Sequence, residues 1–91
     1  MPYIAQDKRL MLEHALATLA ASVIVEEPKN QAGVVNYCIS ALLNEVLKTN
    51  GMSYQNINEL IGVLECAKLE LYRRVASPYE DEKIQSNGDV Y

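Results

Sequence analysis

Residues able to carry out covalent or metal chemistry are few in this sequence. The single histidine, His14, follows Glu13, and Cys38 and Cys66 lie in separate apolar segments with no CxxC spacing. A cysteine becomes an effective nucleophile when a base such as histidine lies within hydrogen-bond reach, and the spacing here does not indicate such a contact. No residues at metal-ligand spacing accompany His14. We therefore expect reduced, buried thiols, a partly exposed structural histidine, and no catalytic residue, metal or cofactor.

A second group of polar residues suits binding better than catalysis. The stretch LYRRVASPYEDEK combines cations with phenol rings near the end of a long apolar segment. Guanidinium groups bind phosphate oxygens in a forked geometry, and aromatic rings can stack on a base. Equally, arginines near a helix C-terminus can satisfy carbonyl groups, with tyrosines at the edge of a core. The candidate ligand-binding residues are Tyr72, Arg73, Arg74, Tyr79 and Lys83.

The carboxylates of the chain have simple structural explanations. Glu65 with Lys68 and Glu70 with Arg74 stand at helical spacing, which is typical of surface ion pairs. The acidic run 80–82 falls where the first turn of a helix is expected, and there it complements the helix dipole. These patterns do not require a pair of catalytic carboxylates.

Composition and charge limit the classes of function. The 91 residues suffice for one domain, and 49% of them are hydrophobic, as in a globular protein with one modest core. A net charge of -4 disfavours binding to duplex nucleic acid. No apolar run approaches the length of a membrane span, and the first residues do not resemble a secretory leader. We expect a cytoplasmic protein that binds neither duplex nucleic acid nor membrane.

Apolar residues at intervals of three or four predict an all-α fold. In the first helix, for example, Leu12, Leu16, Leu19 and Val23 share one face. The expected architecture is a small bundle of three main helices, followed by a short, bent C-terminal helix. The predicted helices of this single domain, residues 1–91, are 7–25, 32–49, 58–76 and 78–86.

Several residues predict where these helices begin and end. Asp7 is a plausible cap of the first helix, and Pro28 and Gly33 are expected to bracket a polar turn before the second. Gly51 suits the C-terminal end of the second helix. Ser77 and Pro78 together favour a break, after which a fourth helix starts at a new angle.

The third helix carries more apolar surface than two neighbouring helices can cover. Its main stripe includes Leu60, Leu64 and Leu71, but further apolar residues lie outside the centre of that stripe. A surplus of this kind is typical of a partner surface, and symmetric homo-oligomers are the commonest solution. A glycine inside a helix costs about 1 kcal/mol relative to alanine, which close packing against a partner would offset. The expected oligomer interface is Gly62, Val63, Cys66 and Leu69.

The second half of the chain contains several specific strings. These are LECAKLE, YRR, PYED and NGDVY, accompanied by VNYCISALLNEVL and the opening MPYI. Over residues 34–91 the chain resembles a family of small uncharacterised proteins from bacteriophages and prokaryotic genomes. It departs from that family at Leu71 and Ser77, where Phe and Ala are expected. The resemblance implies a phage-type, all-helical accessory protein, and it carries no mechanism.

Two non-enzymatic functions fit these features. In the first, a homo-oligomer binds and sequesters a phosphate-bearing small ligand, such as a host nucleotide second messenger used in antiviral signalling. In the alternative, the chain is a protein–protein interaction module that engages a host or phage protein through the apolar face of the third helix. For a phage-encoded protein, either function would take place in the host cytoplasm.

Overall fold

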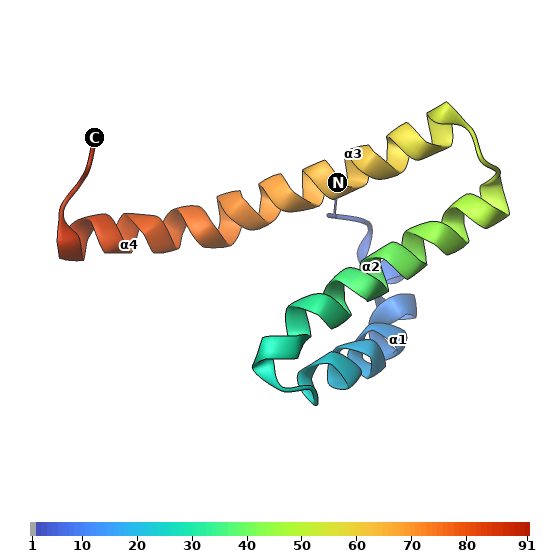
Figure 1. Cartoon of the computed structure of the whole chain (residues 1–91), viewed down its shortest axis with the longest axis horizontal. Helices are drawn as coiled ribbons and strands as arrows, with labels where there is room; N and C mark the ends of the chain where they lie inside the picture. The colour runs from blue at the N-terminus through green and yellow to red at the C-terminus, as the bar shows by residue number, and fades with distance from the viewer. Residues whose placement is uncertain (1) are drawn as a thin grey trace. The chain divides into compact units, whose positions relative to one another are not determined.

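The computed structural model describes residues 2–91, and within this range it contains helices and turns but no strand (Figure 1). The all-α prediction is confirmed. The described chain divides into two compact units, one comprising residues 3–57 and the other comprising Pro2 with residues 58–91.

The first unit is built on a hairpin of two helices, α1 (Gln6–Ile24) and α2 (Pro28–Asn50), which pack against each other. The residue before α1 is Ala5, and no side chain caps the helix. Asp7 lies in the first turn, so its prediction as the cap is wrong, although its charge still complements the helix dipole. Val23 and Ile24 complete α1 as helix.

The connection between α1 and α2 is shorter than the sequence predicts. Pro28 is the first residue of α2, because its fixed φ suits the first turn and that position needs no backbone donor. Lys29 and Gln31 therefore belong to the helix, and the predicted polar turn from Pro28 to Gly33 is wrong. The Gln31 amide donates to the carbonyls of Ile24 (3.4 Å) and Glu26 (3.1 Å), which satisfies acceptors at the end of α1.

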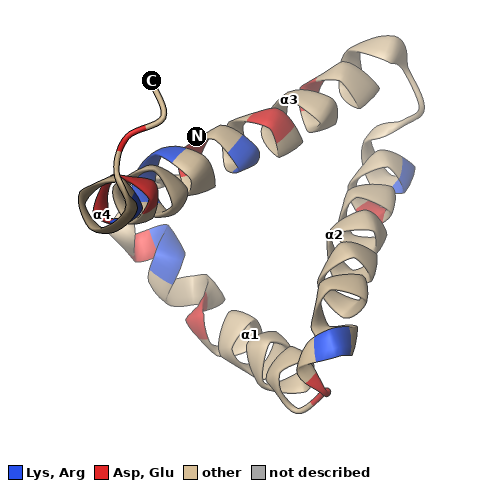
Figure 2. Cartoon of the chain, turned by 60° about the vertical axis from the view of Figure 1, so that its left-hand side comes forward, with Lys and Arg blue, Asp and Glu red and all other residues tan. Residues whose placement is uncertain are grey.

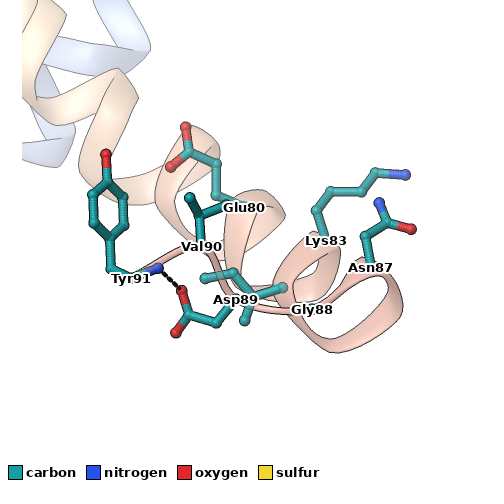
Figure 3. Close-up of a pocket in the computed structure, with 8 residues that line it drawn as sticks. Glu80, Lys83, Asn87, Gly88, Asp89, Val90 and Tyr91 are labelled. Atoms are coloured by element: carbon teal, nitrogen blue, oxygen red, sulfur yellow. Dashed lines mark hydrogen bonds between the residues drawn. The ribbon is translucent and has the colours of Figure 1, made fainter.

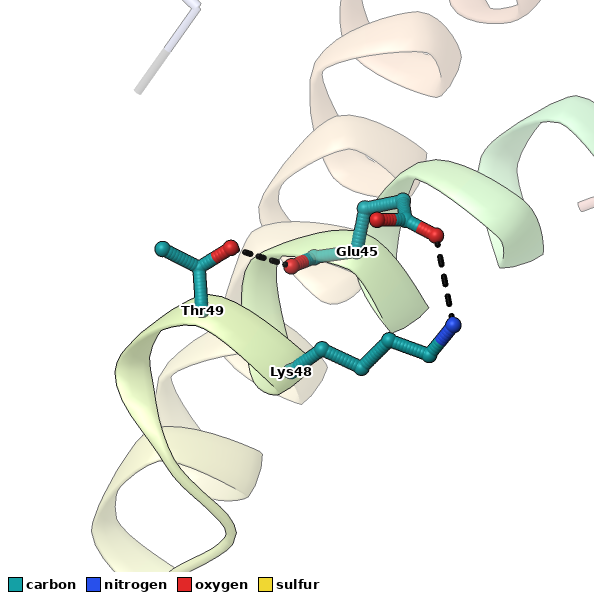
Figure 4. Close-up of polar contacts among 3 residues, drawn as sticks. All are labelled: Glu45, Lys48 and Thr49. Carbon is teal, nitrogen blue, oxygen red and sulfur yellow. Dashed lines mark hydrogen bonds and ion pairs between the residues drawn. The ribbon is translucent and has the colours of Figure 1, made fainter.

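The end of α2 is fixed by a glycine, as predicted. Gly51 has φ +104°, and its N–H donates to the Leu47 carbonyl at 2.8 Å. In the last turns, Lys48 Nζ lies 3.4 Å from Glu45 Oε1, and the Thr49 hydroxyl donates to the Glu45 carbonyl at 3.0 Å (Figure 4).

The third helix, α3 (Tyr54–Leu71), begins four residues before the predicted start at residue 58. Ser53 explains the difference, because its hydroxyl accepts the Asn56 N–H at 3.1 Å and so caps the first turn. The Asn56 amide in turn donates to the Gly51 carbonyl at 2.9 Å, which closes the connection from α2.

The predicted bend at Ser77 and Pro78 is wrong. A five-residue π-helix, η1 (Tyr72–Ala76), follows α3 and leads directly into α4 (Ser77–Asn87) (Figure 1). Ser77 has helical φ and ψ of -62° and -49°, and its N–H donates to the Tyr72 carbonyl. Pro78 lacks a donor and would clash with the carbonyl four residues earlier in an α-helix. The π-turn accommodates the proline by widening the helix, so the helix continues where a break was expected.

The expected buried core is not found among the described residues. None of them is buried, and the most enclosed apolar positions, such as Val23, Val34 and Ala41, are only half-buried. Within the unit that contains residues 58–91, no other helix packs on the run formed by α3, η1 and α4. Most of the apolar surface of this helix is therefore open within its own unit.

Candidate functional site

The five predicted ligand-binding residues lie along η1 and the first turns of α4. Tyr72 is the first residue of η1, and its hydroxyl donates to Glu80 Oε2 at 3.0 Å. This contact joins two consecutive helical segments through side chains eight residues apart. The sequence predicted Glu80 as the third residue of a capping box with Ser77 and as a complement to the helix dipole, not as the partner of Tyr72, and no side-chain cap is formed there.

The π-turn is what aligns Tyr72 with Glu80. In an α-helix, residues eight apart stand about 80° out of line around the axis. One extra residue in the intervening turn brings them close to the alignment of a seven-residue separation, about 20° out of line. The segment that accommodates Pro78 therefore also places the two side chains on one face.

The contact changes the acidity of the phenol. The hydrogen bond to Glu80, the negative charge of that carboxylate, desolvation of the phenol and the charge of Asp81, in that order, raise the pKa of Tyr72 above its ordinary value of 10.0. Tyr72 consequently stays protonated and acts as a hydrogen-bond donor at neutral pH.

Arg73 is bound within its own helix. Its Nε lies 3.0 Å from Glu70 Oε1, and its terminal nitrogen forms a close ion pair with the same oxygen. The sequence predicted Glu70 to pair with Arg74, and that prediction is wrong, because the residue three positions away faces the carboxylate. The predicted pair of Glu65 with Lys68 is confirmed at 3.0 Å. Among the described residues, Arg74 has no hydrogen-bond or ion-pair partner.

Lys83 and Tyr79 form the third contact of this region. The Lys83 ammonium lies 5.3 Å from the centre of the Tyr79 ring, within the range of a cation–π interaction. Lys83 also lines a shallow hollow of about 340 Å³ between α4 and the last residues of the chain (Figure 3). Glu80 and Asp89 line the same hollow, and the Asp89 side chain accepts the Tyr91 N–H at 3.0 Å. Two carboxylates beside one ammonium do not favour an anion there.

Charge is unevenly distributed among the helices (Figure 2). Acidic and basic residues are interspersed along α3, η1 and α4, so the segment presents no extended surface of one sign. In contrast, residues 14–24 of α1 and 30–44 of α2 contain no Asp, Glu, Lys or Arg. The charged end of the chain suits polar recognition, and the hairpin suits apolar contacts.

The four predicted interface residues share one face of α3. Val63 and Leu69 are 52% and 56% exposed, and Cys66 is exposed as well. A Cβ built on Gly62 would meet no atom within 4 Å, and this glycine does not have a positive φ. Neither space nor backbone geometry within the chain explains a glycine at this position. Pro2 lies at the side of this face, around a hollow of about 130 Å³ that Val63, Cys66 and Ala67 also line.

The opposite face of α3 is also apolar. Residues on one helix face recur every three or four positions, and Ile57, Leu60, Ile61, Leu64 and Leu71 follow this spacing about half a turn away from Cys66. Ile61 and Leu71 are 58% and 64% exposed. The helix thus presents two opposed apolar faces.

The structure adds an apolar groove that the sequence did not predict as a site. It measures about 300 Å³, lies between α1 and α2, and has Cys38 half-buried in its wall. Both cysteines are free thiols, but the prediction that both are buried is wrong because Cys66 faces outward. The other residues lining the groove are Leu16, Leu19, Ala20, Val23, Ile24, Val35 and Ile39.

Across the described part of the chain, no three His, Cys, Asp or Glu residues are grouped so that they could hold a metal ion. In the same range, no helix combines the length and apolar character needed to cross a membrane.

The sequence relationship covers almost the entire chain. A family model described as "Domain of unknown function (DUF6899)" matches residues 1–90. The chain belongs to the DUF6899 family. No curated protein and no solved structure gives a significant match to it. Membership in DUF6899 confirms the expected relationship to an uncharacterised family, and it extends that relationship through the N-terminal third.

Proposed function

We propose that this DUF6899 protein is a non-catalytic binding protein that works as an assembly of identical copies. The observation that carries the proposal is the pair of opposed apolar faces on α3, on a chain in which none of the described residues is buried. Burying apolar surface is the dominant favourable contribution to folding and association. A helix with two such faces is stable in water when both are covered.

One chain has too few helices to cover both apolar faces of α3, which supports the presence of a partner. In a three-helix bundle, each helix turns one side toward its two neighbours and the other toward solvent. Packing of this kind covers one face of each helix. The other face then needs a surface from outside the chain, and a second copy supplies one at equal concentration.

The hairpin itself supports the same conclusion. α1 carries Leu10, Met11 and Leu16, which are 66%, 76% and 64% exposed and point in different directions around the helix. A helix that is apolar on several faces is typical of the interior of an assembly. One neighbouring helix, α2, covers only part of it.

Sedimentation velocity across a concentration series tests self-association. We expect a single discrete species heavier than the 10.2 kDa chain, with a mass that changes little between low and high salt, because apolar contacts are not screened. A monomer at all concentrations would overturn the proposal. A captured protein of another kind, with the purified chain remaining monomeric, would favour the alternative of a module for a host or phage partner.

A second candidate function, binding of a phosphate-bearing small ligand such as a nucleotide second messenger, is favoured by one specific observation. Arg74 has no partner among the described residues, and it lies in the same helical run as Arg73, Lys83 and two tyrosines. Guanidinium groups near aromatic rings suit a nucleotide. Since Arg73 already pairs with Glu70, Arg74 is the stronger candidate contact.

Native mass spectrometry with cyclic dinucleotides and cyclic trinucleotides as probes tests this function. We expect a bound nucleotide on the wild type and its loss from Arg74→Glu, with unchanged binding in the control Lys29→Glu, whose side chain lies in the first turn of α2. Equal binding by both variants, or no binding by the wild type, would exclude the Arg74 region as a nucleotide site.

A further inference from the structure

We infer that two copies of the chain pair antiparallel through the Cys66 face of α3, with the two Cys66 side chains meeting at the two-fold axis. The inference rests on the self-association proposed above and specifies its partner, face and register. We define the Cys66 face as Glu59, Gly62, Val63, Cys66, Leu69 and Arg73.

The spacing of this face is that of a helix–helix seam. Glu59, Gly62, Cys66, Leu69 and Arg73 follow one another at alternating intervals of three and four residues. This alternation, with an average of about 3.5 residues, keeps a seam facing a partner helix along its length. The seam is apolar or small at its centre and charged at both ends.

The face is self-complementary about Cys66. Glu59 lies seven residues before Cys66 and Arg73 seven residues after it, so a two-fold axis at Cys66 places each glutamate opposite the arginine of the other copy. Val63 and Leu69 lie three residues to either side and meet in the same way. An antiparallel pair therefore gains two ion pairs and two apolar contacts from one face.

The two charged ends are accessible for such pairing. Glu59 is exposed and has no ion-pair partner among the described residues. The Arg73 side chain remains 64% exposed although it pairs with Glu70. A guanidinium carries five N–H donors, so it can bind a second carboxylate at the same time.

Gly62 supports a close approach at this face. Its conformation is ordinary for a helix, and no atom lies within 4 Å of the position that a Cβ would occupy. In a chain whose Cys66 face remained in solvent, alanine would be the more stable residue. A helix of a second copy packed next to Gly62 would explain why glycine stands there, because small residues allow two helix backbones to approach closely.

Mixing two charge-reversed variants provides the sharpest test. In Glu59→Arg, the pair would place two arginines opposite each other at both ends, and in Arg73→Glu it would place two glutamates there. A heterodimer of the two variants has opposite charges at both ends. We expect each variant alone to dimerise at least about ten-fold more weakly than the wild type, which corresponds to about 1.4 kcal/mol, and the equimolar mixture to recover the wild-type affinity.

Matched controls come from the same helix. Glu65→Arg and Lys68→Glu reverse another helical ion pair, in which Glu65 lies to the side of the Cys66 face and Lys68 lies on the opposite side of the helix. We expect these two variants to dimerise like the wild type, alone or mixed. Circular dichroism of all four variants checks that helix content is maintained, since Arg73→Glu also removes the pair with Glu70. Failure of the mixture to recover dimerisation would overturn the register.

Oxidative cross-linking locates the axis independently. Two cysteines form a disulfide when their Cα atoms come within about 7 Å. In a Cys38→Ser background, mild oxidation should convert most of the protein into a covalent dimer, and Cys66→Ser should abolish it. A dimer in sedimentation that does not cross-link would overturn the inference but leave the proposed self-association standing. A monomer in sedimentation would overturn both the inference and the proposed self-association. A disulfide between Cys38 and Cys66 of one wild-type chain would show that the chain itself covers the Cys66 face.

Discussion

At the scale of single residues, the contact between Tyr72 and Glu80 predicts a specific pH dependence. The raised pKa of Tyr72 means that the folded chain favours the protonated phenol. Its stabilising effect is therefore complete below the unfolded pKa of 10.0 and is lost as the pH rises through the higher folded pKa. The chain has six tyrosines. We expect Tyr72 to ionise at a higher pH in the wild type than in Glu80→Gln.

Ultraviolet absorbance of the tyrosinate ion measures this titration. In Glu80→Gln, part of the high-pH transition should move to lower pH, because the negative charge that opposes ionisation is gone. The control is Glu82→Gln, which removes a nearby carboxylate that does not contact Tyr72. Identical curves for the wild type and Glu80→Gln would show that the hydrogen bond is absent in solution.

Alanine substitutions at two glycines should change the stability of the protein in opposite directions. Gly33 lies inside α2, and Gly51 follows the last residue of α2. Gly51 has φ +104° and ψ 148°, a backbone region that is essentially restricted to glycine and that alanine enters only at a cost of about 1–3 kcal/mol. Gly33 lies inside α2 without a positive φ, and no atom would contact its Cβ, so alanine should stabilise the helix by about 1 kcal/mol. Thermal unfolding should therefore shift down for Gly51→Ala and up for Gly33→Ala. Shifts in the same direction would contradict this account.

The binding residues could be predicted from the sequence only as types, not as contacts. The string LYRRVASPYEDEK indicated Tyr72 and Arg73 as candidate binding residues. Which carboxylate each of them contacts, Glu80 or Glu70, is determined by the angles between side chains around the helix axis. Those angles follow from the π-turn, which no local pattern in the chain predicted.

At the scale of the helices, Pro78 controls the π-turn, and its removal should change two measurements together. In Pro78→Ala, the clash with the Arg74 carbonyl disappears and a backbone donor returns, so η1 can become α-helical. We expect stabilisation of about 1–3 kcal/mol and slower amide exchange across residues 74–80. Without the wider π-turn, Tyr72 should also move away from Glu80, and the pKa of Tyr72 should fall toward 10.0.

Pro28→Ala is the matched control for this variant. Pro28 occupies the first position of α2, where proline is well accommodated, so the substitution should change stability little. If Pro78→Ala left both amide exchange and the tyrosine titration unchanged, the proline would not be the cause of the π-turn.

Helix positions followed from the sequence more closely than helix ends did. Apolar spacing reflects many residues at once, and it placed the first three α-helices, whereas the fourth was expected from Ser77 and Pro78. Each missed boundary depended on one or two residues with competing roles. Pro28 can end a turn or start a helix, Ser53 and Asn58 can each cap, and Ser77 before a proline can break a helix or continue it through a π-turn.

At the scale of the whole molecule, the sequence indicated that α3 has more apolar surface than the chain can bury. It did not indicate which surface covers the remainder. Helical periodicity assigns residues to faces, and it says nothing of which faces meet, since that depends on surfaces distant along the chain or on another chain. The surplus on α3 was recognised at Gly62, Val63, Cys66 and Leu69 for this reason, whereas the groove beside Cys38 arises only when α1 and α2 pack together.

Self-association predicts that thermal stability depends on protein concentration. When unfolding is coupled to dissociation of a dimer, a ten-fold dilution weakens the assembled state by about 1.4 kcal/mol per dimer. The melting temperature should therefore fall steadily over a hundred-fold dilution, and the slope should persist at high salt because most of the buried surface is apolar. High salt should lower the melting temperature by a small constant amount if the ion pairs of Glu59 with Arg73 contribute. In either charge-reversed variant this offset should change sign, because salt then screens the repulsion between like charges. A melting temperature independent of concentration would mean that each chain covers its apolar faces by itself.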